Sequence, residues 1–217
     1  MNSIDYLLSM ETKGIKLGLK RTQRIMAACG DPHKQLNSIQ VAGTNGKGSV
    51  CAMLANIFNL SKFKTGLFTS PHLTNVNERI RVNGVPISNK NIDCFIKKYK
   101  LDIEEVDASF FETMTAMAFW YFKKNKVDIA ILETGLGGRM DSVSICQPLI
   151  TIITPISFDH IEILGKTLKN IAFEKAGIIK QNTYCISAKQ KKSVENVLIK
   201  EALKKNAPIQ FIDNKNI

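Results

Sequence analysis

The chain has 217 residues, of which 44% are hydrophobic and 23% charged, the balance of a folded globular protein. No apolar run approaches the ~20 residues that span a bilayer. Residues 1–16 include acidic side chains and lack an apolar core with a cleavage site. We therefore expect neither a membrane anchor nor a signal peptide. Five cysteines without Cys-x-x-Cys spacing predict free thiols in a cytoplasmic protein.

The formal net charge of +11 comes from an excess of lysine. Pairs such as Lys97-Lys98 and Lys191-Lys192 are typical of polar helix faces. Because aromatic residues do not interleave with a basic patch and no nucleic-acid-binding module is recognisable, binding to nucleic acid is not expected. The charge is instead expected to attract a polyanionic small molecule.

Hydrophobic periodicity predicts alternating helices and strands along the chain. Helices are expected near 3–11 and 20–29, followed by a strand at 38–42, a glycine-rich loop, a helix at 48–60 and a strand at 65–69. A hairpin near 79–87 precedes helices at 89–99 and 110–124 and strands at 127–132 and 149–154. A helix at 167–176, a strand at 183–187, a helix at 190–205 and a strand at 208–212 complete the pattern. This alternation predicts an α/β fold whose mostly parallel sheet has helices on both faces.

A glycine-rich loop at residues 43–49 lies between the expected strand at 38–42 and the following helix. Its glycines let the backbone wrap an anion, and the helix N-terminus points at that anion. Lys47 would contact the β- and γ-phosphates of a nucleotide, and Ser49 offers an oxygen to Mg²⁺. The spacing departs from G-x-x-x-x-G-K-[ST], so an ordinary turn remains an alternative. The candidate ATP-binding residues are Gly43, Thr44, Asn45, Gly46, Lys47, Gly48 and Ser49.

With four further stretches, this loop resembles the Mur ligase superfamily, and within it the folylpolyglutamate and dihydrofolate synthases. The stretches are LFTSPHL at 67–73, NERIRVNG at 77–84, LETGLGGRMDS at 132–142 and SFDHIEILGKTLKNIAFEKAGIIK at 157–180. Enzymes of this family use ATP to join a carboxylate to an amino acid through an acyl phosphate. The resemblance therefore implies a P-loop-containing ATP-binding domain like the central domain of Mur ligases.

The length of the chain predicts a single domain. In the resembled family, the ATP-binding domain is longer than this chain, and a smaller glutamate-ligase domain follows it. Residues 1–217 are therefore expected to be an incomplete ATP-binding domain, truncated at Asn216 and Ile217. Such a chain is expected to bind nucleotide weakly and to ligate poorly on its own.

Three residues at strand ends are candidate metal ligands. Ser70 and Glu133 each follow an expected strand, and a carboxylate beside a nucleotide suits Mg²⁺, which takes oxygen donors. His160 lies in the loop after the strand at 149–154. From sequence alone, a turn-capping serine, a surface glutamate and a loop histidine are the alternatives. The resemblance implies that the serine and glutamate hold one Mg²⁺ and that the histidine shares a second.

Lys175, in FEKAGIIK, is a further metal-ligand candidate through the resemblance alone. Since an ammonium group repels Mg²⁺, the sequence by itself favours an exposed helix lysine beside Glu174. In the resembled family, CO₂ carboxylates the lysine at this position. The resulting carbamate oxygens can ligate the second Mg²⁺.

Ser109 and Glu112 frame a Ser-x-x-Glu pattern before an apolar helix, and the pattern predicts a capping box. The resemblance adds a second interpretation, in which three segments contact pteroate. Relatives that use dihydropteroate can carry an acidic residue where this chain has Lys16, so the chain departs from their pattern there. The candidate pteroate-binding residues are Lys16, Leu17, Gly18, Ser109, Phe110, Phe111, Glu112, Met140, Asp141 and Ser142.

The resemblance implies a ligation in which the γ-phosphate of ATP passes to a folate or dihydropteroate carboxylate. The amine of L-glutamate then displaces phosphate. Lys47, His160 and Lys175 are expected at the reaction centre, where they position groups and screen charge. Small molecules are the expected partners of a monomer that binds two Mg²⁺ ions. Two other classes remain open: a cell-wall Mur ligase that binds a uridine nucleotide, and a P-loop nucleotide-binding module without ligase activity.

Overall fold

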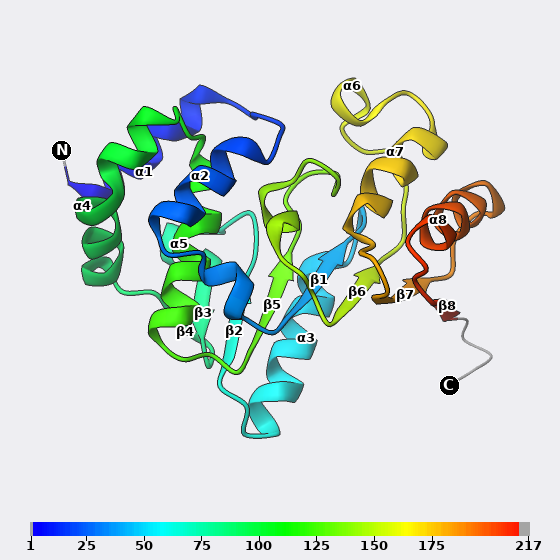
Figure 1. Cartoon of the computed structure of the whole chain (residues 1–217), viewed down its shortest axis with the longest axis horizontal. Helices are drawn as coiled ribbons and strands as arrows, with labels where there is room; N and C mark the ends of the chain where they lie inside the picture. Colours follow the sequence, from blue (N-terminus) through cyan, green and yellow to red (C-terminus); the bar gives the residue numbers. More distant parts are fainter. Residues whose placement is uncertain (1, 213–217) are drawn as a thin grey trace.

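A computed structural model describes residues 2–212 (Figure 1). Eight strands form one sheet in the order β4-β3-β2-β5-β1-β6-β7-β8. The six strands β2, β5, β1, β6, β7 and β8 run parallel to their neighbours in this order. At the other edge, β3 pairs antiparallel with β2, and β4 pairs antiparallel with β3. The strands are β1 (Ser38–Ala42), β2 (Thr65–Phe68), β3 (Ile80–Val82), β4 (Val85–Pro86), β5 (Ile129–Glu133), β6 (Ile150–Ile153), β7 (Tyr184–Ala188) and β8 (Ile209–Ile212). The expected mostly parallel sheet is confirmed.

Helices cover both faces of this sheet, as expected (Figure 1). On one face, α3 packs over β1, β2 and β5, and its buried Cys51 joins a cluster with Val41 and Ile131. Because successive strand residues point to opposite faces, Ala42 lies on the other side, in a cluster with residues of α7 and α8. The helices are α1 (Ser3–Ser9), α2 (Lys20–Ala28), α3 (Lys47–Leu60), α4 (Asn89–Glu105), α5 (Phe110–Lys124), α6 (Ile161–Leu164), α7 (Leu168–Lys175) and α8 (Lys192–Lys204).

The main core lies between the sheet and α5, which is buried along nearly its whole length. Phe122 comes so close to β2 that a Cβ on Gly66 would lie 2.8 Å from its ring. This approach explains the glycine in an otherwise β-branched and apolar strand. The core therefore fixes α5, and with it the loop that precedes its N-terminus, against the sheet.

Two helices differ from expectation. The first ends at Ser9 and continues as a 3-10 turn, η1 (Met10–Lys13), instead of reaching residue 11 as one helix. Helix α4 runs to Glu105 because Ile103 continues the buried stripe of Phe95 and Tyr99. Four further 3-10 helices, η2 (Pro32–Gln35), η3 (Val76–Arg79), η4 (Ser142–Ile145) and η5 (Ala176–Ile178), and the short α6 had no clear periodic signal.

Within residues 2–212, no helix is long and apolar enough to cross a bilayer. The expected truncation point at Asn216 and Ile217 lies outside the described residues. The loops after β1, β2, β5 and β6 meet at one edge of the sheet, because parallel strands place their carboxyl ends together. The candidate site residues gather at this edge.

Candidate active site

The glycine-rich loop connects β1 to α3, as the sequence predicts. Gly43 has a φ of 142°, and a Cβ there would lie 1.9 Å from Oγ1 of Thr154, so no other residue fits. Thr44 anchors the loop to the segment after β6: its N–H donates to the carbonyl of Pro155, and its hydroxyl donates to the carbonyl of Ser157, at 3.0 and 3.1 Å. These two hydrogen bonds hold the loop against the segment that follows β6.

The start of α3 is suited to an anion. Gly46, its N-cap, has a φ of 83° and supplies no side-chain cap, so the first backbone N–H groups remain available to a ligand. Lys47 begins the helix, and its ammonium group donates to the carbonyl of Thr44 at 3.2 Å. Asn45 reaches Oγ of Ser157 at 3.5 Å. Gly48 and Ser49 lie in the first turn, as expected for a phosphate-binding helix.

Glu133 and Ser70 lie together, as expected for two ligands of one metal ion. The carboxylate of Glu133 is 4% exposed and accepts the backbone N–H of Ser70 at 3.1 Å. Burial raises the pKa of this carboxyl group. A Cβ on Gly48 would lie 3.7 Å from Oε2 of Glu133, so the carboxylate lies against the helix of the phosphate loop. This buried carboxylate, which is hydrogen-bonded to the backbone of Ser70 and lies against an anion site, fits the oxygen-donor chemistry of Mg²⁺.

Lys175 is buried, so the interpretation of an exposed lysine is wrong. Its side chain is 2% exposed, its Nζ donates to the carbonyl of Gly43 at 2.7 Å, and it lies 3.6 Å from Oδ2 of Asp159. Burial, reinforced by the charge of Lys47, lowers the pKa of Lys175 to about 8. About one-fifth of this amine is therefore neutral at pH 7.4.

Lys175 is placed by the glycine-rich loop after β5. A Cβ on Gly138 would lie 2.8 Å from the carbonyl oxygens of both Glu174 and Lys175, so only glycine lets the loop approach the end of α7. The N–H of Arg139 donates to the carbonyl of Glu174 at 2.8 Å, and its guanidinium pairs with Glu201. These contacts hold the end of α7 against the loop after β5.

His160 caps α6 in the left-handed region, with a φ of 42°, and its side chain is half-exposed. Its Nε2 lies 3.5 Å from Oδ1 of Asp159, which sequence analysis left without a role although it precedes the histidine directly. Among residues 2–212, no group of three or more His, Cys, Asp or Glu side chains is arranged to hold a metal ion. The metal-ligand roles of Ser70, Glu133, His160 and Lys175 therefore stay predictions.

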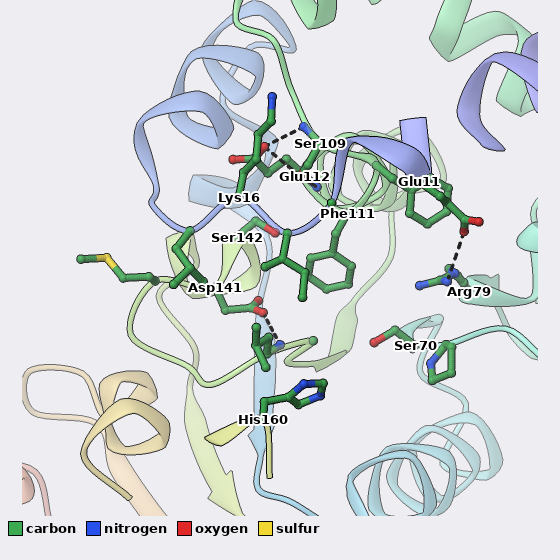
Figure 2. Close-up of a pocket in the computed structure, with 18 residues that line it drawn as sticks. Glu11, Lys16, Ser70, Arg79, Ser109, Phe111, Glu112, Asp141, Ser142 and His160 are labelled. Carbon is green, nitrogen blue, oxygen red and sulfur yellow. Dashed lines mark hydrogen bonds and ion pairs between the residues drawn. The ribbon is translucent and has the colours of Figure 1, made fainter. Parts of the chain in front are cut away.

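A cavity of about 340 Å³ opens beside these residues (Figure 2). It brings together the three segments that the resemblance associates with pteroate, and it adds Ser70 and His160 from the expected metal site. Gly18 is outside the lining, although its N–H donates to the carbonyl of Met140 at 3.3 Å. The predicted residues that line the cavity are Lys16, Leu17, Ser109, Phe110, Phe111, Glu112, Met140, Asp141 and Ser142.

Charges at the upper end of the cavity in Figure 2 are matched within the protein. The capping box of α5 is confirmed, because Ser109 and Glu112 bond each other's backbone N–H groups. Glu112 also accepts Nε of Arg21 at 2.9 Å. Lys16 pairs with the carboxylate and carbonyl of Asp107.

Asp141 lies on the floor of the cavity and is buried. Its carboxylate accepts the N–H groups of Leu136 and Val143 at 2.8 and 2.9 Å. Burial nevertheless raises the pKa of Asp141 to about 6, because desolvation outweighs these two hydrogen bonds.

Sequence analysis assigned no role to Glu11 or Arg79, which also line the cavity. Arg79 lies within the NERIRVNG stretch, which supported the resemblance and could have drawn attention to it. His72, in the loop that follows β2 and within the LFTSPHL stretch, accepts the Nε–H of Arg79 through its Nδ1 at 2.8 Å. Only the folded chain shows that these three side chains meet, because 61 residues separate His72 from Glu11.

The strand-to-helix phosphate loop, the buried glutamate and the buried lysine are features of a nucleotide-binding α/β domain. The model of the Mur ligase middle domain matches residues 41–216, so the chain belongs to the Mur ligase family. It is 43% identical over 206 residues to the dihydrofolate synthase/folylpolyglutamate synthase of Bacillus subtilis, covering 92% of this chain and 48% of that protein.

Solved structures agree with this relationship. The folylpolyglutamate synthase of Mycobacterium tuberculosis complexed with ADP and AMPPCP superposes with a TM-score of 0.88 at 34% identity, covering 98% of this chain and 51% of that chain. Escherichia coli FolC in complex with DHPP and ADP superposes with a TM-score of 0.90 at 31% identity, covering 97% and 51%. The chain therefore spans about half the length of these relatives.

Proposed function

We propose that this chain is the ATP-binding part of a ligase that joins L-glutamate to the carboxylate of a folate or of dihydropteroate. The observation that carries the proposal is the cavity, which extends from the predicted pteroate-binding segments to Ser70 and His160 (Figure 2). Its volume of about 340 Å³ lies in the range of small-molecule sites. A substrate bound there would present one end to the phosphate loop.

In the proposed reaction, a carboxylate oxygen attacks the γ-phosphorus of ATP, and the bond to ADP breaks. The glutamate amine then attacks the acyl carbon, a proton leaves the nitrogen, and phosphate departs with the electrons of its bond to carbon. Lys47 and the N-terminus of α3 would hold the phosphates and offset their charge. Bound Mg²⁺, which Ser70 and Glu133 would hold, would supply further charge stabilisation.

We further propose that Lys175 becomes a carbamate that, with His160, completes a second Mg²⁺ site. The low pKa of this lysine supports the proposal, because only the neutral amine attacks CO₂. Asp159 lies close to both side chains and would be an additional oxygen donor. The exclusion of water around a 2% exposed side chain would protect the carbamate from hydrolysis.

Product analysis tests the proposed function. The chain is incubated with ATP, Mg²⁺, L-glutamate and either dihydropteroate or tetrahydrofolate, and the products are resolved by mass. Formation of the glutamyl amide supports the proposal. ATP hydrolysis at the same rate without glutamate would instead favour a P-loop module, and thermal stabilisation by a UDP-muramoyl peptide but not by a pteroate would favour a cell-wall ligase.

We propose that efficient ligation also needs a glutamate-ligase domain, as the resemblance implies, and that the protein acts as a monomer in the cytoplasm. A second domain would close over the cavity, exclude water and hold the amine at attacking distance. Turnover of this chain as fast as that of a two-domain relative would contradict the first statement. Sedimentation of the chain as a dimer would contradict the proposed monomeric state.

A further inference from the structure

Arg79 places a buried cation at the Ser70 end of the cavity. The residue is 8% exposed and ends η3, directly before β3. Its carbonyl accepts the N–H of Thr69 at 3.0 Å, which ties its backbone to the segment leading to Ser70. Both Ser70 and Arg79 line the cavity. The guanidinium is therefore held beside the expected metal site.

Three neighbours orient this guanidinium, and the carboxylates of Glu11 and Glu133 stabilise its charge from a distance. Nε donates to Nδ1 of His72 at 2.8 Å, and the group lies over the ring of Phe110, 4.9 Å from the ring centre. Glu11 is 4.0 Å away and 45% exposed, so its pairing with Arg79 is weak. Within residues 2–212, the two terminal nitrogens of Arg79 have no hydrogen-bond acceptor. The open side of its planar fork thus remains available to a ligand.

Lys16 and Glu112, which also line the cavity, are hydrogen-bonded to oppositely charged side chains. Lys16 is bound by Asp107, and the carboxylate of Glu112 is bound by Arg21. A desolvated arginine whose terminal nitrogens are not hydrogen-bonded to a carboxylate favours an anion, and its fork matches the two oxygens of a carboxylate. The chemistry of Arg79 is therefore suited to a ligand with a carboxylate at the Ser70 end of the cavity.

We propose that Arg79 binds the carboxylate of the acceptor substrate and holds it at the Ser70 end of the cavity, beside the phosphate loop. This inference rests on the proposed function, in which that carboxylate must meet the γ-phosphate. The opposite end, around Lys16 and Met140, would then receive the ring system. His72 acts as a positioning residue, because its Nδ1 fixes the plane of the guanidinium.

The binding of pteroate and of its carboxamide tests this assignment. Both ligands are titrated calorimetrically into the chain with Mg²⁺ and a non-hydrolysable ATP analogue. The native chain should prefer the acid by about 10- to 100-fold, the factor for a hydrogen-bonded charge. Arg79→Gln should reduce this preference about tenfold or more, leaving only the part that bound Mg²⁺ supplies. Arg81→Gln is the matched control, because Arg81 donates to the carbonyl of Glu78 and is outside the cavity lining.

Each outcome is decisive. A native chain that binds neither ligand would overturn the proposed function, and the inference with it. Binding of pteroate with an acid preference that is unchanged in Arg79→Gln would overturn the inference alone. Should Arg79→Gln not fold, Glu11→Gln removes the competing carboxylate and should raise the acid preference about two- to fivefold. An unchanged preference in that variant would count equally against Arg79.

Discussion

Carboxylation of Lys175 should be measurable directly. With a pKa of about 8 rather than 10.5, about 24% of this amine is neutral at pH 7.5, against about 0.1% for an ordinary lysine. The burial of the group therefore makes it more than 100-fold richer in the form that attacks CO₂. We expect ¹³C-labelled bicarbonate to produce one carbamate resonance in the ¹³C spectrum of the chain with Mg²⁺ and a non-hydrolysable ATP analogue.

The pH dependence of this resonance follows from the protons released. Below pH 8, the ammonium form loses two protons on carboxylation, and above pH 8 the neutral amine loses one. At fixed dissolved CO₂, the apparent carboxylation constant should therefore rise about 100-fold per pH unit below 8 and about tenfold per unit above it. A uniform tenfold slope down to pH 6.5 would show that the amine is already neutral there.

A matched pair of variants assigns the resonance. Lys175→Met should abolish it. Lys180→Met should retain it, although Lys180 is also largely buried, donates to the carbonyl of Ser144 at 2.6 Å, and has a pKa lowered by burial. A resonance that persists in Lys175→Met, or that never forms in the native chain at saturating bicarbonate, would refute the carbamate.

Four further outcomes are expected. Lys47→Ala should weaken ATP binding about tenfold or more by calorimetry, because a charge on the phosphates is lost. Glu133→Gln should keep the fold, checked by circular dichroism, and raise the Mg²⁺ concentration needed for nucleotide binding; unfolding without a changed metal response would make Glu133 structural. Gly43→Ala should lower both the Tm and ATP affinity, because its methyl group would lie 1.9 Å from Oγ1 of Thr154. The pKa of Asp141 is raised from 3.8 to about 6 in the folded chain, so the folded state binds this proton more tightly than the unfolded state. The resulting contribution to the free energy of unfolding is fully present below pH 3.8 and is lost as the pH rises through 6. Asp141→Asn should remove that decline, about 3 kcal/mol, from urea unfolding curves.

The phosphate loop and the capping box of α5 could be predicted from sequence because they are local. The glycines at 43 and 46 serve φ values that other residues rarely adopt, and Ser109 and Glu112 satisfy each other's backbone within one turn. Hydrophobic periodicity likewise predicted the sheet and most of its helices. Periodicity predicted that α4 ends at residue 99, whereas the helix continues to Glu105 with Ile103 buried in its last turns.

The chemistry of the site was decided by tertiary contacts. The sequence by itself favoured an exposed Lys175, whereas its ammonium group bonds Gly43, 132 residues away, in a site that excludes water. The candidate role of Arg79 follows only from its tertiary contacts with Phe110 and His72. The desolvation of a charge and the number of its partners depend on residues far apart in the chain, so periodicity and spacing cannot encode them. The sequence thus determined which residues follow the strands, and the packing of the folded chain decided their exposure, charge and partners.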